Sequence, residues 1–402
     1  MLLYFCGRPR HYLMVMRNMP KTGLKNARGE FPVLLSSRPC GDGRTEQWEF
    51  ESYGIGLSEM QAYSERMESA FDVAITNMRT GKDEHKTLLN VVLHPGPWPE
   101  RIEWDDSYLP EDADKLAFGD ARGEQIILDL GKTSHCSISA RTGSGKSVLI
   151  NCLMFQCALH GMILLLIDYK DGMDYSAWDR KIEVASKDGP VIELLERLQE
   201  ISRLRRRVLK DAGCANIDEY NKRHLFQRMP RIIAFVDEAA ECLDKTGESK
   251  ERKDLIDRIA GGFSSIARTG RAVGISVVFA QQRASADIFP GSVRNNVYCI
   301  CGIADRNLAK LALGDEDAAK RIPSDARGRF IDENHIMFQS YYIKMTRERL
   351  DKIAFLSLDD LDDNSTVLYT AICRDVDGEG DTIEIVGWEV DKEDIERDVE
   401  GN

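Results

Sequence analysis

The sequence predicts an α/β fold with a mainly parallel sheet flanked by helices, joined to a small N-terminal α+β region. Three observations support this prediction. From about residue 120 onward, short apolar strand patterns alternate with helical patterns, which is typical of a parallel sheet with helices on both faces. One of these strands runs into a glycine-rich loop that opens a helix, and another ends in two carboxylates. The expected strands cover residues 135–140, 162–168, 231–237, 274–280 and 298–303.

Residues 1–115 precede this alternation and mix strand and helix signals. The segments 12–16 and 31–35 are compatible with strands, and 88–93 predicts a strand that ends at a proline-rich loop. Between residues 57 and 79 apolar side chains recur at intervals of three and four, which predicts one helix. We therefore expect residues 1–115 to form a small region of their own.

The chain has 402 residues, a formal net charge of −13 and 43% hydrophobic residues, enough for one large core and a smaller domain. We expect the main domain over residues 116–345 and an acidic extension over 346–402, whose negative charge is typical of a solvated surface. No apolar run is long enough to cross a bilayer, and no basic, signal-like segment opens the chain. We therefore expect no transmembrane segment in this chain and a cytoplasmic location, with attachment at the inner face of the cell membrane as an open alternative.

The loop Ala140–Ser147, which reads Ala-Arg-Thr-Gly-Ser-Gly-Lys-Ser, carries the strongest chemical signal. It lies between a strand pattern and a helical pattern, as a phosphate-binding loop (P-loop) requires, although such loops usually begin with glycine rather than alanine. Gly143 and Gly145 allow backbone angles that let several N–H groups converge on one anion. Lys146 can then reach the β- and γ-phosphates of ATP, and Ser147 can ligate Mg²⁺. The residues expected to contact the nucleotide are Ala140, Thr142, Gly143, Ser144, Gly145, Lys146 and Ser147.

An apolar run that starts at Arg231 leads into a pair of carboxylates, Asp237 and Glu238. A run that is apolar throughout predicts a strand buried on both faces. Because ligands of parallel sheets bind at the carboxyl ends of strands, these two acids should lie beside the glycine-rich loop. We expect Asp237 to hold Mg²⁺ through water, and Glu238 to polarise the water that attacks the γ-phosphate. The two segments together predict a site for ATP and Mg²⁺.

A further strand, 274–280, runs into Gln281 and Gln282, and a basic segment precedes it. On these residues the chain resembles the FtsK/SpoIIIE family of ring-forming translocases, within the broader FtsK–HerA class. The resemblance covers about residues 120–345. It rests on Thr142–Ser147, Arg205–Asn221, Asp237–Glu238, Arg271–Ile275 with Gln282–Ser285, and Arg327–Phe330. Two positions depart from the family pattern, because Gln281 and Ala284 stand where the family has threonine and proline.

This resemblance implies a RecA-like P-loop NTPase fold, assembly into a homo-hexamer, and ATP hydrolysis coupled to translocation of double-stranded DNA. It implies that Gln282 senses the γ-phosphate, since its amide can donate to a phosphate oxygen and accept from the lytic water. It also implies that Arg271 reaches into the neighbouring subunit's site as an arginine finger, with Arg268 as the second candidate. The expected catalytic set is Glu238, Lys146, Arg271 and Gln282.

Three functions are compatible with these residues. The first is a double-stranded DNA translocase most like the coupling ATPases of Gram-positive conjugative elements, working with a membrane-anchored transfer apparatus. The second is a protein-secretion motor of the type VII kind. Those chains usually carry several tandem motor domains, whereas this chain has a single P-loop. The third is a nucleotide-gated regulator, which Glu238 and Gln282 argue against because hydrolysis uses both positions.

A helical pattern that begins near residue 190 ends in a cluster of cations. Two interpretations stay open: contact with nucleic acid or an adjacent subunit, or cations that complement the C-terminus of the helix. The cluster consists of Arg203, Arg205, Arg206, Arg207 and Lys210.

Overall fold

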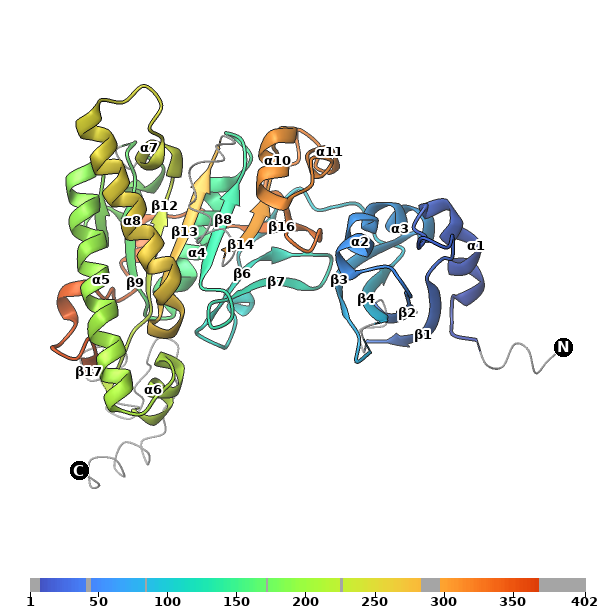
Figure 1. Ribbon diagram of the computed structural model, residues 1–402, viewed down its shortest axis with the longest axis horizontal. Helices are drawn as coiled ribbons and strands as arrows, with labels where there is room; N and C mark the ends of the chain where they lie inside the picture. Colours follow the sequence, from blue (N-terminus) through green and yellow to red (C-terminus); the bar gives the residue numbers. More distant parts are fainter. Residues whose placement is uncertain are drawn as a thin grey trace. The chain divides into compact units, whose positions relative to one another are not determined.

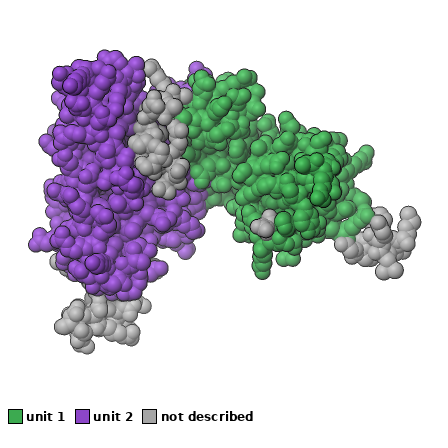
Figure 2. Space-filling view, in the orientation of Figure 1, with its two compact units in different colours: residues 1–102, 119–126, 299–341 green, residues 103–118, 127–298, 342–402 purple. Residues whose placement is uncertain are grey.

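The structure is a computed structural model that describes residues 8–40, 45–83, 85–170, 173–224, 227–282 and 297–368. The chain divides into two compact units, shown in different colours in Figure 2. Unit 1 comprises residues 1–102, 119–126 and 299–341, and unit 2 comprises residues 103–118, 127–298 and 342–402. The three-part division at residues 115 and 345 stays a prediction.

The N-terminal part of unit 1 is an antiparallel sheet covered by short helices (Figure 1). Its strand order is β1-β2-β4-β3, and Trp48, Phe50 and Phe71 are buried in its core. The elements are α1 (Tyr12–Thr22), β1 (Val33–Pro39), β2 (Thr45–Glu51), α2 (Leu57–Ala62), α3 (Ser64–Phe71), β3 (Val73–Thr80) and β4 (Lys86–Leu93).

Two predictions for this part were wrong. Residues 12–16 lie in helix α1 rather than in a strand, and Val15 and Met19, one helical turn apart, are fully buried. The single helix expected over 57–79 ends at Phe71, because Asp72 adopts a left-handed conformation with φ 54°. The residues that follow are rich in β-branched side chains, and they pair with β4 as strand β3. An apolar spacing of three or four was therefore misleading across this turn.

Unit 2 contains a parallel sheet with the strand order β10-β9-β12-β13-β8. Four strands expected from the sequence are confirmed to within one residue at each end. These four are β8 (His135–Ser139), β9 (Ile163–Ile167), β12 (Ile232–Val236) and β13 (Ile275–Gln281), and the fifth strand of the sheet, β10 (Glu183–Ala185), was not expected.

Another group of strands pairs antiparallel, so both parallel and antiparallel strand pairs follow the N-terminal sheet. β15 pairs antiparallel with β14 and with β16, and β16 pairs antiparallel with β6. The bounds are β5 (Ile102–Glu103), β6 (Lys115–Asp120), β7 (Gln125–Asp129), β14 (Val297–Cys301), β15 (Arg329–Asp332) and β16 (Met337–Tyr342). The expected mainly parallel sheet is correct for the strands that carry the nucleotide loop and the paired acids.

Helices cover both faces of the parallel sheet. Ile163, Leu165 and Ile167 of β9 belong to the core beneath α5 and α8. Successive strand residues point to opposite faces, so Leu164 and Leu166, also buried, must be covered on the other side. The helices of unit 2 are α4 (Lys146–Leu159), α5 (Asp188–Asp211), α6 (Ile217–Arg223), α7 (Ala239–Leu243), α8 (Lys250–Val273) and α12 (Arg347–Leu350), whereas α10 (Arg306–Leu313) and α11 (Ala318–Arg321) belong to unit 1.

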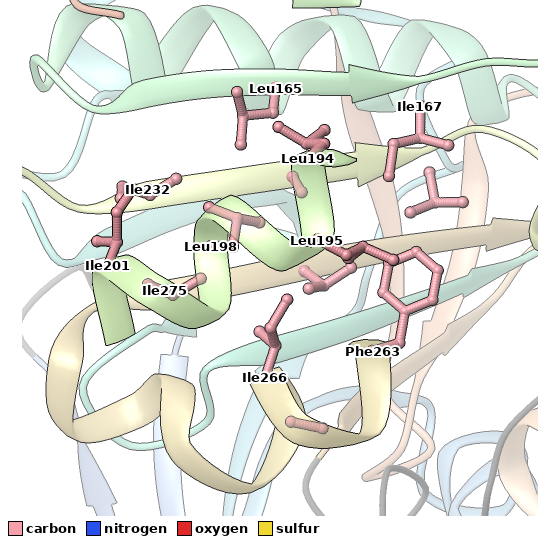
Figure 3. Packing of buried hydrophobic residues seen from close by; sticks show 14 of the residues in the cluster. Leu165, Ile167, Leu194, Leu195, Leu198, Ile201, Ile232, Phe263, Ile266 and Ile275 are labelled. Carbon is pink, nitrogen blue, oxygen red and sulfur yellow. The ribbon is translucent and has the colours of Figure 1, made fainter. Parts of the chain in front are cut away.

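The long helices α5 and α8 lie side by side and share one apolar layer (Figure 3). Leucines of α5 and large apolar side chains of α8 meet over the sheet, and a buried Leu or Phe contributes about 1.5–3 kcal/mol relative to an exposed one. The labelled members are Leu165, Ile167, Leu194, Leu195, Leu198, Ile201, Ile232, Phe263, Ile266 and Ile275.

Arg205, a member of the cationic cluster, is fully buried rather than available to a partner. Its guanidinium donates to Ser365 Oγ at 2.9 Å and to the main-chain oxygens of Val273 and Pro230, each at 2.8 Å. Burial lowers the pKa of Arg205 to about 9. For this residue both interpretations of the cluster were wrong, because Arg205 ties the segment near residue 365 to unit 2.

The four other cations of the cluster are exposed, so either interpretation is compatible with them. The segment near residue 365 is also held by a two-stranded antiparallel sheet, formed by β11 (Gln227–Arg228) and β17 (Val367–Leu368). Within the ranges that the structure describes, no helix is both long and apolar enough to cross a membrane.

Candidate nucleotide-binding site

The glycine-rich loop has the backbone that anion binding requires. It leaves the carboxyl end of β8 and enters α4, with Gly143 at φ 80° and Gly145 at φ 101°, both in the left-handed region. A Cβ at Gly143 would meet nothing within 4 Å, so the backbone angle, rather than crowding, favours glycine there. Ser144 is buried, and its hydroxyl has no hydrogen-bond partner among the described residues. The loop therefore holds a polar group that a bound anion can satisfy.

Lys146 and Asp237 form a buried pair at the centre of the site. Lys146 Nζ donates to the main-chain oxygen of Asp237 at 2.7 Å and lies 3.4 Å from its carboxylate Oδ1. Both side chains are about 5% exposed or less. β12 and β8 are both hydrogen-bonded to β13 in parallel, so the residue after β12 reaches the loop after β8. The prediction that Asp237 lies beside the loop is confirmed.

Glu238 and Gln282 meet on the same side of the sheet. The main-chain N–H of Gln282 donates to Glu238 Oε1 at 3.3 Å, and Thr142 Oγ1 donates to the Gln282 side-chain oxygen at 2.7 Å. Burial raises the pKa of the Glu238 carboxyl, an effect that the charges of Lys146 and Lys170 oppose. The structure thus brings together every predicted catalytic residue except Arg271. Arg283–Ser285, which carry part of the family pattern, lie outside the described residues.

Three residues of the site were missed from the sequence. Lys170 Nζ lies 3.6 Å from Glu238 Oε2, Ser147 Oγ donates to Asp174 Oδ2 at 2.8 Å, and Tyr175 OH donates to Asp237 Oδ1 at 2.7 Å. All three follow β9, whose carboxyl end lies beside that of β12. The argument that placed Asp237 at this edge of the sheet applies equally to the residues after 162–168 and would have found them.

Arg271 lies far from these groups within one chain. It is near the end of α8, just before β13, whereas Gln282 follows the other end of that strand. Seven strand residues span roughly 20 Å at about 3.3 Å per residue. Arg271 is exposed and lines a recess of about 320 Å³ with Gly131, Asn216 and Asp218. Arg268, the second candidate, is also exposed. Either arginine can act on a P-loop only if that loop belongs to another subunit.

The donors around the loop fit a Mg²⁺–nucleotide complex. Ser147, Asp174 and Asp237 offer a hydroxyl and two carboxylates, which are the oxygen ligands that Mg²⁺ prefers. In the described part of the chain no group of three or more His, Cys, Asp or Glu side chains could hold a metal by itself.

The loop between β8 and α4, the acids after β12 and the parallel strand order together define a P-loop nucleotide-binding domain. Residues 103–286 match the FtsK/SpoIIIE family, and the chain therefore contains an FtsK/SpoIIIE family domain.

Three known proteins show how far this likeness extends. The DNA translocase FtsK of Treponema pallidum (strain Nichols) is 28% identical over 278 residues, 60% of this chain and 33% of that protein. The conjugation coupling protein TcpA of pCW3, solved in its monomer form with ATPγS, aligns with a TM-score of 0.60 and 28% identity over 83% of this chain and 95% of that one. EssC (ATPases 2 and 3) of Geobacillus thermodenitrificans aligns with a TM-score of 0.50 and 15% identity, over 64% of this chain and 50% of that one, which shows the fold alone. The chain thus spans about a third of the FtsK relative and nearly all of the TcpA structure.

Proposed function

We propose that this chain is an ATP-driven motor that translocates double-stranded DNA, and that it acts as a coupling ATPase in the transfer of a conjugative element. The observation that carries the proposal is that unit 2 brings the P-loop, the Lys146–Asp237 pair and the Glu238–Gln282 contact to one edge of its sheet. The likeness to FtsK supports DNA as the cargo, and the likeness to TcpA supports the conjugative role.

Each residue has a chemical task in this proposal. The main-chain N–H groups of the P-loop donate to phosphate oxygens, and Lys146 exchanges Asp237 for the β- and γ-phosphates. Glu238 accepts a proton from the attacking water, and Gln282 orients that water against the γ-phosphate. Ser147 and Asp237 would hold Mg²⁺, which would neutralise charge that develops on the phosphates.

The proposed assembly is a homo-hexameric ring. Because Arg271 cannot reach the P-loop of its own chain, a neighbour's arginine would complete each site. A ring can bind duplex DNA through its phosphates even though the whole chain is acidic, since only the channel has to be basic. We place this ring in the cytoplasm, next to a membrane-anchored transfer apparatus.

The test is the ATPase rate of the assembled protein with added duplex DNA at two salt concentrations. We expect stimulation at low salt that weakens as salt rises, is similar for unrelated DNA sequences, and exceeds that of heparin at equal charge. Glu238→Gln protein, carried through the same assay, controls for contaminating ATPases. Absence of stimulation at low salt, in samples shown to contain rings, would overturn DNA as the cargo and leave the protein-secretion function.

A further inference from the structure

Asp174 is an exposed carboxylate at the entrance of the nucleotide site. Its Oδ2 accepts a hydrogen bond from Ser147 Oγ at 2.8 Å, and Ser147 is the hydroxyl expected to ligate the nucleotide's ion. Among the residues that the structure describes, no lysine or arginine is paired with Asp174. An uncompensated carboxylate at this place repels the phosphates of a nucleotide, unless a divalent cation lies between them.

We propose that Asp174 is a further oxygen ligand, beside Ser147 and Asp237, of the divalent cation that enters with the nucleotide. The inference rests on the proposed function, because it concerns the ion of the ATP site. Mg²⁺ takes six oxygens at 2.0–2.1 Å in an octahedron, so neighbouring ligand oxygens lie about 2.9 Å apart. Ser147 Oγ and Asp174 Oδ2, 2.8 Å apart, already have the separation of two adjacent ligands.

The segment that carries Asp174 is anchored on both sides of the site. This is the 3₁₀ segment η3 (Met173–Trp178), in which Tyr175 and Trp178 are buried. Tyr175 OH donates to Asp237 Oδ1 at 2.7 Å, and Trp178 Nε1 donates to Asn151 Oδ1 at 2.7 Å. Asn151 in turn donates to the main-chain oxygen of Ser147 at 2.8 Å. Asp174 therefore contacts Ser147 directly, and its neighbour Tyr175 fixes the same segment to Asp237, through side chains that do not need the ion.

A purely structural role would also explain the Ser147–Asp174 hydrogen bond, and two substitutions separate the possibilities. Asp174→Asn keeps a side-chain oxygen that can accept from Ser147 but removes the negative charge. Asp174→Glu keeps the charge and should retain part of the cation affinity. Asp179→Asn makes the same chemical change five residues away, at an exposed position paired only with surface arginines in the described part of the chain, and serves as the matched control.

The experiment measures binding rather than turnover, on the full chain. Mn²⁺ is titrated into protein with ATPγS and followed by the electron paramagnetic resonance signal of the free ion. ATPγS affinity is measured separately in Mg²⁺ and in EDTA. For Asp174→Asn we expect Mn²⁺ affinity to fall about 10- to 100-fold. ATPγS affinity should fall in Mg²⁺ yet stay equal or rise in EDTA, since the carboxylate no longer repels the phosphates.

Three outcomes would overturn the inference. The first is Mn²⁺ affinity of Asp174→Asn within twofold of the wild type. The second is an equal loss of ATPγS affinity in Mg²⁺ and in EDTA, as a structural role predicts. The third is a wild-type protein that binds no ATPγS in either Mg²⁺ or EDTA, which overturns the proposed function as well. The first two leave the ATP site intact, so the two failures are distinguishable.

Discussion

The ammonium of Lys146 donates a hydrogen bond to the main-chain oxygen of Asp237 at 2.7 Å. The residue expected to contact the phosphates is therefore already bound to the residue expected to hold Mg²⁺. The Asp237 carboxylate, 3.4 Å away, completes a pair that is almost entirely buried. Nucleotide binding must exchange this contact for one with the phosphates. The same pair therefore links the stability of the site to its occupancy.

Lys146→Ala should abolish ATP turnover, because it removes the cation that contacts the β- and γ-phosphates. Removing one partner of a buried pair also costs about 3–5 kcal/mol, so thermal melting has to be recorded beside the ATPase rate. Lys132→Ala, at an exposed lysine whose described partner is the partly buried Asp129, is the matched control. A folded Lys146→Ala protein that retains a tenth of the wild-type rate would contradict the assignment.

Glu238→Gln should slow hydrolysis by about two or more orders of magnitude and leave ATPγS binding intact, as loss of a general base does. The amide still accepts from Gln282 N–H, so the local contact is preserved. Single-turnover hydrolysis and nucleotide affinity, measured on the same sample, separate chemistry from binding. Turnover at the wild-type rate would show that another group activates the water.

The sequence was sufficient wherever chemistry is encoded locally. The four strands that carry the site were predicted to within a residue, because runs such as 163–167 are apolar throughout, which is typical of a strand buried on both faces. Lys146, Asp237 and Glu238 were predicted together, since parallel strands place their carboxyl ends at one edge, whereas Gln282 was assigned from the resemblance to the FtsK/SpoIIIE family.

The sequence was insufficient wherever a long-range contact decides. Arg205 lies in a cationic cluster, and nothing local shows that Val273, Pro230 and Ser365 satisfy its guanidinium. Likewise, the position of Asp174 after β9 predicts that it lies near the site, but its hydrogen bond with Ser147, 27 residues earlier, is seen only in the structure. Such partners depend on packing that no periodicity reports.

His135 should make the protein less stable in mild acid. It is buried, and its Nδ1 accepts the main-chain N–H of Val277 at 3.1 Å. Burial lowers the pKa of His135 to about 4, below its ordinary value of 6.5. The folded state therefore favours the neutral ring. The contribution of His135 to the free energy of unfolding is fully present above pH 6.5 and is lost as pH falls towards 4. Between pH 7.5 and 5.0 the loss from this group is about 2 kcal/mol.

Denaturant unfolding at these two pH values measures the effect. His135→Asn keeps an acceptor for Val277 but cannot be protonated, so its stability should depend less on pH even if it is lower throughout. His94→Asn, at a histidine whose side chain is 82% exposed, should keep the wild-type dependence. Equal pH dependence in His135→Asn and the wild type would contradict the prediction.

Ser365→Ala should destabilise unit 2 by about 1–3 kcal/mol, because Arg205 Nε loses its acceptor in a fully buried position. For the same reason, truncation after residue 355 should lower the melting temperature, whereas truncation after 368 should not. Ser58→Ala, at an exposed serine, is the control. Truncation after residue 368, the shorter of the two deletions, also removes acidic residues. It should therefore raise DNA affinity or leave it unchanged. Equal melting temperatures for both truncations would show that Ser365 is dispensable.

Arg271→Ala should lower the ATPase rate of the assembled protein by on the order of 10³- to 10⁵-fold, as loss of an arginine supplied by a neighbour does. Arg271 and Gln282 lie at opposite ends of β13, so Arg271 must act on the nucleotide site of a second chain. Mixing inactive Arg271→Ala subunits with inactive Lys146→Ala subunits should then restore part of the activity. At a mixed interface an intact P-loop meets an intact arginine, so the restored rate should rise and fall with the mixing ratio and peak between the extremes. Arg268→Ala, three residues earlier on α8, tests the second candidate in the same assay. A mixture that stays inactive, or a wild-type rate per subunit that persists after dilution to demonstrated monomers, would contradict action between subunits.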